Sequence, residues 1–343
     1  MAIDFITEGG AQALLDNIKD VTKWTRLWLG QGWEGDPDWP LFVQLCRKGV
    51  GPKLFKIGDE IPSTYTLTNG TVYDYPWIVV DFQTVELENG VKYDNIPILQ
   101  AKYTNHEQVQ FDCYERVVAT EETAQDGYYY IGYTSSYTAL NLSTGDTIPY
   151  EDYTTIYKSL WNSVYPAGYG NSAWALSYLR QYLNNSGTGY WTAQHACDSA
   201  PTTQRTGFLT YMPAEMVNAL TPIKRTTTRA NYMSNVVDTT YDKFWIASHS
   251  EMNFATSSSI ANDGSPWAYY KQILNSDTPV STGTYAAMIR YACNVTTSAN
   301  NWWSRSANLS GFTERLILSS GLTSSNSYNP VNSNYVLPCT ALV

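Results

Sequence analysis

The sequence is poor in charged residues and in histidine. Of its 343 residues, 15% are charged and three are histidine, and the formal net charge is −10. Globular domains usually contain about 25% charged residues, so this chain depends on hydroxyl and amide groups for its hydration. Lys and Arg form no run, and a nucleic-acid backbone is bound through clustered cations. We therefore expect no nucleic-acid partner.

Long apolar runs are also absent. No stretch reaches the ~18 apolar residues of a transmembrane helix, so we expect no membrane span. The chain begins MAIDFITEGGAQALLDNIKDVTKW, with early acidic residues and no apolar h-region. This is not the pattern of a signal peptide. If the protein acts outside the cell, we expect it to leave by another route, such as phage lysis.

Cysteine is scarce and has no metal or redox spacing. The chain contains Cys46, Cys113, Cys197, Cys293 and Cys339, and no CxxC pair. This spacing argues against zinc and thioredoxin-like sites. An odd number of cysteines without an export signal favours free, buried thiols in a reducing compartment. A Cys293–Cys339 disulfide is the alternative.

Aromatic residues, by contrast, are abundant. They make up 14% of the chain, with 28 Tyr and 12 Trp, and hydrophobic residues reach 43%. This content allows a large core, and it is typical of β-rich proteins and of aromatic-lined binding surfaces.

The first of three regions, residues 1–48, predicts helices. Apolar residues recur at helical spacing up to Trp28, and the stretch GQGWEGDPDWP then interrupts them. LFVQLCRKG predicts a second short helix that ends at Gly49. A helical piece that cannot bury both of its faces suggests an attachment or oligomerisation segment. Packing against its own domain is the alternative.

The other two regions predict an α+β protein. Residues 49–149 form a β-rich region with strands in TVYDYPWIVVDFQTVEL, YDNIPILQAKYT and DGYYYIGYTSSYTALNL, and with a hairpin turn at ENG. Residues 150–343 mix helices and strands. NSAWALSYLRQYLNN predicts a helix capped by Asn171 or Ser172, and PAEMVNALTPI a helix that starts near Pro213. DKFWIASHSEMNF predicts a strand.

An ordered series in the last region carries a resemblance: SYLRQYLNN, MPAEMVNALTPIKRTTT, DTTYDKFWIASHSEMNF, SPWAYYKQ, RYACN, WWSRSA and VLPCTAL. It resembles a C-type-lectin-like domain family of unknown function from gut bacteria and prophages. The family is related in architecture to the sulfatase-modifying-factor fold, and many members look like variable proteins of diversity-generating retroelements. The resemblance implies a C-type-lectin-like ligand-binding domain over residues 150–343, with a variable segment at about 304–335. The calcium-binding Glu-Pro-Asn and Trp-Asn-Asp motifs of true lectins are missing, so we expect no cofactor, although a structural calcium ion stays open.

The composition of the C-terminal segment agrees with this resemblance. Any loop rich in Ser and Asn would agree with it equally well. Adenine-directed mutation of Asn codons cannot produce Lys, Gln, Glu, Met or Trp, and residues 304–343 contain none of these except Glu314. The resemblance implies an apolar frame of six residues: Trp302, Trp303, Leu316, Leu318, Val336 and Leu337. It also implies an outward-facing, ligand-binding set: Asn308, Ser310, Phe312, Thr313, Arg315, Leu322, Thr323, Ser324, Asn326, Tyr328 and Asn329.

Patterns that suggest catalysis are weak. In SHSE, residues 248–251, a strand would point Ser248 and His249 to opposite faces. Catalytic triads are assembled from distant segments, so we expect a hydrogen-bonded core network here. His106 and His195 have no neighbours at metal-ligand spacing. We therefore expect neither an enzyme nor a metal site.

The sequence hypothesis is a phage or prophage virion protein, assembled in the bacterial cytoplasm and active outside the cell. Its C-terminal domain would recognise a host cell-surface protein or glycan. Residues 1–48 would bind other virion proteins or copies of the chain, in a homo-oligomer for which a trimer is favoured. The alternatives are an enzyme related to formylglycine-generating oxidases and a purely structural capsid or tail decoration protein.

Overall fold

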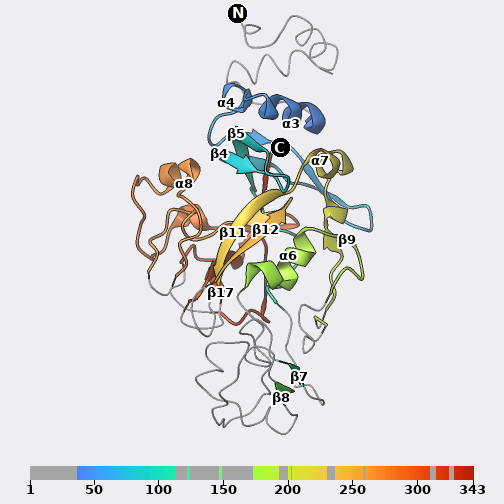
Figure 1. The fold of residues 1–343 in the computed structure, drawn as a ribbon, viewed down its shortest axis with the longest axis vertical. Coiled ribbons are helices and arrows are strands. Elements are labelled where there is room, and N and C mark those ends of the chain that lie inside the picture. Colours follow the sequence, from blue (N-terminus) through green and yellow to red (C-terminus); the bar gives the residue numbers. More distant parts are fainter. Residues whose placement is uncertain are drawn as a thin grey trace, which may run out of the picture.

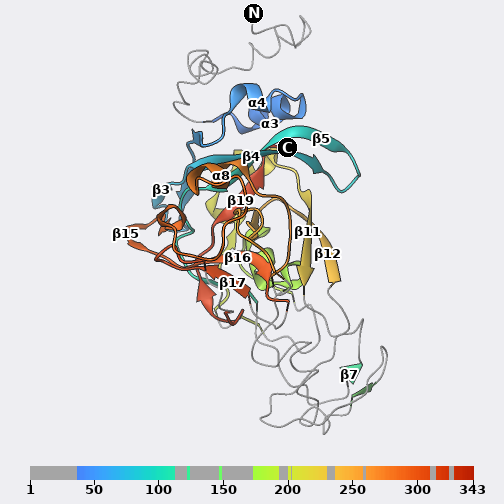
Figure 2. The same ribbon diagram turned by 90° about the vertical axis from the view of Figure 1, so that its left-hand side faces the viewer.

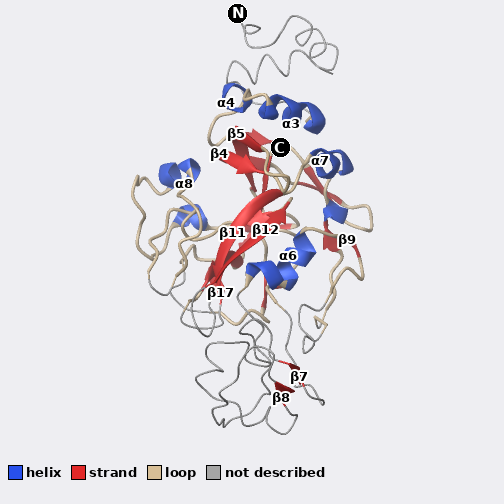
Figure 3. Ribbon diagram, in the orientation of Figure 1, coloured by secondary structure: helices blue, strands red, loops and turns tan. Residues whose placement is uncertain are grey.

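A computed structural model of the chain describes ten ranges: residues 37–112, 122–123, 147–148, 173–192, 200–201, 203–229, 236–257, 260–309, 314–323 and 328–343. Within them the helices are short and the strands are many, in an α+β arrangement (Figures 1 and 3). The α+β class predicted from the sequence is therefore confirmed at this coarse level.

The described helices are short segments on the outside of the strands: α3 Trp39–Arg47, α4 Gly51–Leu54, α6 Tyr178–Leu183, α7 Ala214–Ala219 and α8 Ala268–Ile273. Three single 3₁₀ turns accompany them: η2 Trp174–Leu176, η3 Leu209–Tyr211 and η4 Ala286–Met288. Strands before residue 150 are β1 Glu60–Ile61, β2 Thr64–Thr66, β3 Val72–Asp74, β4 Trp77–Glu86, β5 Lys92–Ala101, β6 Val109–Gln110, β7 Glu122–Thr123 and β8 Thr147–Ile148. Later strands are β9 Ser186–Gly187, β10 Gly207–Phe208, β11 Ile223–Arg229, β12 Val236–Asp242, β13 Trp245–Ile246, β14 Tyr291–Ala292, β15 Val295–Ala299, β16 Trp302–Ala307, β17 Glu314–Ile317, β18 Ser333–Asn334 and β19 Pro338–Ala341.

The largest described sheet has five strands in the order β1-β4-β5-β19-β13. The C-terminal strand β19 is antiparallel to both neighbours, with Cys339 opposite Gln100 of β5 and Trp245 of β13. Figure 2 shows β19 beneath β4 and β5. Strands from the predicted β-rich region and from the predicted C-terminal domain therefore share one sheet. The predicted boundary at residues 149 and 150 lies outside the described residues.

The β4–β5 hairpin follows directly from local sequence. Its ENG turn places Gly90 at φ +80°, a conformation that glycine adopts without steric cost, and Leu87 N donates to Val91 O at 2.8 Å. The continuous apolar run Trp77–Val80 is buried on both faces of the sheet. Helix α8 packs against β4, and helices α3 and α4 pack against β5, its neighbour in the sheet. This cover explains why buried and exposed residues do not alternate along Trp77–Val80 of β4.

Helix α3 confirms the prediction from LFVQLCRKG. Asp38 caps its first turn by accepting from Leu41 N at 3.2 Å, Pro40 stands where no backbone donor is needed, and Gly49 follows at φ +77°. The predicted helix in PAEMVNALTPI is also present as α7, directly after Pro213. The remainder of the predicted helical region, residues 1–36, lies outside the described residues.

Two predicted elements are interrupted in the structure. NSAWALSYLRQYLNN is a 3₁₀ turn followed by α6, because Ser177 is extended at ψ 148° and caps the helix by accepting from Arg180 N at 3.1 Å. The predicted caps Asn171 and Ser172 lie outside the described residues. In DKFWIASHSEMNF, Asp242 ends β12, Trp245–Ile246 form β13, and hydrogen-bonded turns follow up to Asn253.

The predicted apolar frame is largely confirmed. Five of its members are fully buried, namely Trp302, Trp303, Leu316, Val336 and Leu337, and Leu318 is half-buried. Both indole groups also find acceptors, Trp302 Nε1 at Met288 O (3.3 Å) and Trp303 Nε1 at Val109 O (2.8 Å). Within the described ranges, no helix has the length and apolar character that crossing a membrane requires.

Candidate functional site

Described parts of the predicted variable segment meet in the structure. At one end of the β16–β17 hairpin, Ala307 lies opposite Glu314, and Glu314 in turn pairs with Tyr328 through two backbone hydrogen bonds of 2.9 Å. Asn308 follows at the same end and forms a bridge with Ile260. We call this place, made by Ala307, Asn308, Glu314 and Tyr328, the strand-end site.

The predicted outward-facing set divides into three groups. Leu322, Tyr328 and Asn329 are half-buried, so part of each side chain contacts solvent. Three residues are buried, with exposures of 9% for Asn308, 3% for Arg315 and 0% for Thr323, so the prediction that these three face outward is wrong. The other five, Ser310, Phe312, Thr313, Ser324 and Asn326, lie outside the described residues.

Pairing with other segments of the chain is what buries the three misjudged residues. Arg315 is in β17, in which all four residues are buried. Thr323 Oγ1 accepts from Gly283 N at 3.1 Å and donates to Gly283 O at 3.3 Å, and Asn308 is covered by the segment at Ile260. Gly283 and Ile260 are distant in sequence from the residues that they pair with, so local composition carried no signal of these two contacts.

An ionic network lies in the interior behind the strand-end site. Arg305, in the fully buried strand β16, donates from Nη2 to Glu251 Oε2 at 3.0 Å. It also donates from Nη1 to Thr226 O at 2.9 Å and from Nε to Ile246 O at 3.0 Å. Arg225 Nη2 donates to the other oxygen of Glu251. Strands β11 and β13 and the segment at Glu251 each supply an acceptor to this guanidinium, as a buried charge requires.

The two arginine charges of this network determine whether the Glu251 carboxyl is protonated. Burial alone would raise the pKa of the Glu251 carboxyl, but Arg225 and Arg305 outweigh burial and hold that pKa below its usual value. The carboxylate is therefore ionised between two cations. The Arg225 guanidinium also lies 4.7 Å above the Trp245 ring, which stabilises the cation further.

The SHSE segment forms the hydrogen-bonded core network predicted from the sequence. His249 Nδ1 lies 2.9 Å from Ser304 Oγ, and His249 N donates to Ser306 Oγ at 2.9 Å. Ser248 N donates to Glu251 Oε2 at 2.9 Å. Burial, with a contribution from Arg315, lowers the pKa of His249 to about 3. The imidazole is therefore neutral, and within the described ranges no carboxylate hydrogen-bonds to it as in a catalytic triad.

Glu314 is the most unusual group at the strand-end site. Its side chain is fully buried, and neither carboxylate oxygen has a hydrogen-bond partner among the described residues. Burial raises the pKa of Glu314 well above its usual value, against smaller opposing effects of Arg315 and Arg305. A neutral carboxylic acid is therefore favoured here. Glu314 is also the lone Glu of residues 304–343, and its interior position marks it as structural.

Glu314→Gln is expected to flatten the pH dependence of stability. Below pH ~4 the carboxyl is protonated in both states, because the unfolded value is about 4.3. As pH rises, the unfolded chain releases this proton while the folded protein keeps it, so wild-type stability falls until the raised folded pKa is passed. Urea titrations from pH 4 to 8 should show a variant equal to wild type at pH 4 and more stable at pH 7. A constant difference between the two proteins would contradict this.

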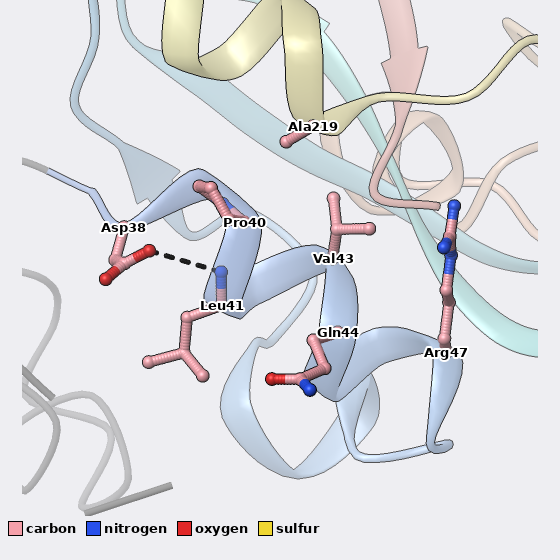
Figure 4. Close-up of a pocket in the computed structure, with 7 residues that line it drawn as sticks. All are labelled: Asp38, Pro40, Leu41, Val43, Gln44, Arg47 and Ala219. Atoms are coloured by element: carbon pink, nitrogen blue, oxygen red, sulfur yellow. Dashed lines mark hydrogen bonds between the residues drawn. The ribbon is translucent and has the colours of Figure 1, made fainter. Parts of the chain in front are cut away.

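A groove lies at the opposite end of the molecule, between α3 and α7 (Figure 4). Its volume is about 490 Å³, and its lining is Asp38, Pro40, Leu41, Val43, Gln44, Arg47 and Ala219. Arg47 Nη2 also donates to Thr221 Oγ1 at 2.7 Å, which ties α3 to the segment after α7. Figures 1 and 2 place α3 and α4 at one end of the described structure and β17 towards the other.

The described cysteines are free and buried: Cys46, Cys293 and Cys339. Burial raises the pKa of Cys293 to about 12, and it raises the pKa values of the other two further. These groups are therefore thiols, whereas nucleophilic and metal-binding cysteines are thiolates. The alternative of a Cys293–Cys339 disulfide is wrong. Cys113 and Cys197 lie outside the described residues.

One polar cluster in the structure was not predicted from the sequence. Tyr65 Oη and His106 Nδ1 lie 2.8 Å apart, Tyr65 stacks on Tyr211 with 4.9 Å between ring centroids, and Glu107 pairs with Arg205 at 3.1 Å. Burial, with the charge of Arg205, lowers the pKa of His106 to about 4. The cluster joins segments more than a hundred residues apart, and so it holds the fold together. His195 lies outside the described residues.

Metal ligation has no support in the geometry. In the part of the chain that the structure describes, no three His, Cys, Asp or Glu side chains are grouped to hold a metal ion.

Comparison with known proteins yields one family. Residues 151–340 match a family model described as "Domain of unknown function (DUF6273)". No curated protein and no solved structure shows significant similarity to the chain.

Proposed function

The chain belongs to the DUF6273 family, whose description assigns no activity, and we propose from the chain's own geometry that it is a ligand-binding protein of a phage or prophage virion. Tyr328 of the strand-end site and the half-buried Asn329 beside it would recognise a host cell-surface protein or glycan. The C-type-lectin-like fold and diversification by a retroelement are parts of the same proposal. The virion location, with action outside the cell, belongs to it as well.

The observation that carries this proposal is the pairing of Glu314 with both Ala307 and Tyr328. It brings described parts of the predicted variable segment, which lies at about 304–335, together at one end of a small sheet. Recognition surfaces that change in sequence need this arrangement, because neighbouring positions then act on one ligand. Tyr328 and Asn329 are partly exposed there, and Tyr is enriched among residues that dominate binding energy.

Two further features support a division of the domain into a stable base and a variable surface. The strand-end site stands on the buried Arg305–Glu251 network and on Trp303, while exposed substitutions usually change stability by less than ~0.5 kcal/mol. Segment 1–48, of which residues 37–48 are described, would provide attachment to virion proteins or to other copies, with a trimer favoured. Its helix α3 lies at the opposite end from β17 (Figure 1).

The combined variant Phe312→Ser, Tyr328→Ser and Asn329→Ala is expected to fold and to lose adsorption to host cells. It leaves out Arg315, which is buried. Removing the aromatic groups should reduce adsorption of the labelled protein by tenfold or more, equivalent to ~1.4 kcal/mol. Adsorption is measured by flow cytometry, and folding is checked by thermal melting.

Val237→Ser is the matched control, since Val237 is 62% exposed on β12, in another hairpin. It should adsorb like wild type. A folded triple variant that also adsorbs like wild type would refute the proposed face and favour the purely structural decoration protein.

A further inference from the structure

Two hairpin turns share the same central residues and the same geometry. Asn69–Gly70 joins β2 to β3, and Asn89–Gly90 joins β4 to β5. All four residues are exposed, and the two glycines have φ values of +87° and +80°. In each turn the asparagine Oδ1 accepts from the backbone N–H two residues later, at 3.0 Å in the first turn and 3.1 Å in the second. The two turns are therefore a matched pair within one chain.

An asparagine followed by glycine contains both partners of a ring-closing reaction. The glycine nitrogen can attack Cγ of the asparagine, because the next residue has no Cβ to obstruct the approach. A bond forms between this nitrogen and Cγ, the Cγ–Nδ2 bond breaks, and the proton of the nitrogen departs with the amide group as ammonia. Water then opens the five-membered imide at either carbonyl. The product is an aspartate or an isoaspartate, with one additional negative charge.

In the folded protein each glycine nitrogen is held away from this reaction. Gly70 N donates to Leu67 O and Gly90 N donates to Leu87 O, both at 2.9 Å. The nitrogen must give up this hydrogen bond before it turns toward Cγ, so the end of the hairpin must open first. The rate at each site therefore depends on the free energy of local opening, which differs widely within one structure.

The two hairpins differ in what holds them closed. β2 and β3 have three residues each and form a two-stranded sheet by themselves, an arrangement of marginal stability. β4 and β5 have ten residues each and lie in the five-stranded sheet, with α3, α4 and α8 packed against them. Tyr65 anchors β2 in the core, but Leu67 beside the turn is only half-buried. Leu87, at the same place in the other turn, is 8% exposed and also bridges Ile223 of β11.

We propose that Asn69 is a site of spontaneous deamidation in the folded protein, and that Asn89 is protected by the sheet that holds its turn closed. The chemistry of both turns is the same, but the first turn opens more often because only a two-stranded sheet holds its end. Each event makes a chain with a formal net charge of −10 more negative, and isoaspartate lengthens the backbone in a tight turn. The proposal is independent of the proposed ligand binding.

Two other asparagines serve as internal references. Asn95 and Asn275 are also exposed, but Ile96 and Ser276 follow them. A side chain at the next residue obstructs the attack on Cγ, which glycine does not. We therefore expect both positions to keep their amide groups over the period in which Asn69 is converted.

The test is incubation of the folded, full-length protein at about pH 8, followed at intervals by peptide mapping with mass spectrometry. We expect the product at position 69 to form tenfold faster or more than the product at position 89, equivalent to ~1.4 kcal/mol in the free energy of local opening. In guanidinium chloride, which removes both hairpins, the two rates should become similar.

Leu87→Ala adds a test of the protecting contact, because it removes the buried side chain beside the second turn. It should accelerate the reaction at position 89, while position 69 in the same molecule serves as the matched control and should keep its rate. The proposal is overturned if the two positions react at similar rates in the folded protein, or if the preference for position 69 persists unchanged in guanidinium chloride. It is also overturned if position 69 stays unmodified in the folded protein while the denatured chain is converted.

Discussion

Glu251→Ala is expected to destabilise the protein by about 3–5 kcal/mol, the cost of leaving a buried charge without its partner. Glu251 is 1% exposed and stands between Arg225 and Arg305, and the Arg305 side chain has no exposure at all. Removing the carboxylate leaves two guanidinium groups together in the interior. Urea unfolding at pH 7, followed by tryptophan fluorescence, measures the loss.

Glu251→Gln separates charge from packing in this experiment. It keeps the size of the side chain and removes the charge, so it should cost nearly as much as the alanine variant. Glu60→Ala is the surface control, because Glu60 pairs with Lys102 at 2.9 Å while 45% exposed, and such pairs contribute about 1 kcal/mol or less. If both Glu251 variants cost no more than Glu60→Ala, the network does not hold the interior together.

Trp303→Ala is the second large effect, with an expected loss of about 3–5 kcal/mol for a fully buried aromatic side chain. The indole packs edge-on against Phe111, with 5.7 Å between ring centroids, and its Nε1 donates to Val109 O. The substitution therefore opens a cavity and leaves a carbonyl without its donor. Thermal melting and urea unfolding both report the change.

Two comparisons make the Trp303 result specific. Trp303→Phe keeps most of the ring and loses the hydrogen bond, so its cost should lie between alanine and wild type. Tyr291→Ala, at a 36% exposed position on β14, should change stability by less than ~0.5 kcal/mol. A melting temperature of Trp303→Ala within about two degrees of wild type would show that this tryptophan does not anchor the hairpin.

The elements that sequence reasoning predicted well are those set by local chemistry. The β4–β5 hairpin depends on Gly90, which adopts φ +80° in a short turn. Helix α3 depends on Asp38 and Pro40 at its start and on Gly49 at its end. Each of these signals lies within a few residues of the structure that it specifies, so a single sequence was sufficient.

Most of the errors at the predicted binding face come from pairing with other segments of the chain. Polar residues between two apolar runs suggested an exposed face, yet Thr323 bonds to Gly283 and Arg315 lies in a buried strand. The polar interior around Arg305 was also not predicted, because its acceptors come from Thr226, Ile246 and Glu251. Burial of a polar side chain depends on such partners, and composition does not reveal them.

The sequence by itself determined the α+β class, the apolar frame around Trp302 and Trp303, and the low content of charge that argues against a nucleic-acid partner. The class and the charge content follow from residue type and from spacing along the chain, and the frame follows from the resemblance that the ordered sequence series carries. Only the tertiary structure decided that β19 joins β5 and β13 in one sheet, that Glu314 is buried beside Tyr328, and that β4 and β11 line a cleft. The physical reason is that a group's charge state, partners and exposure depend on neighbours from distant segments, which only the folded chain brings together.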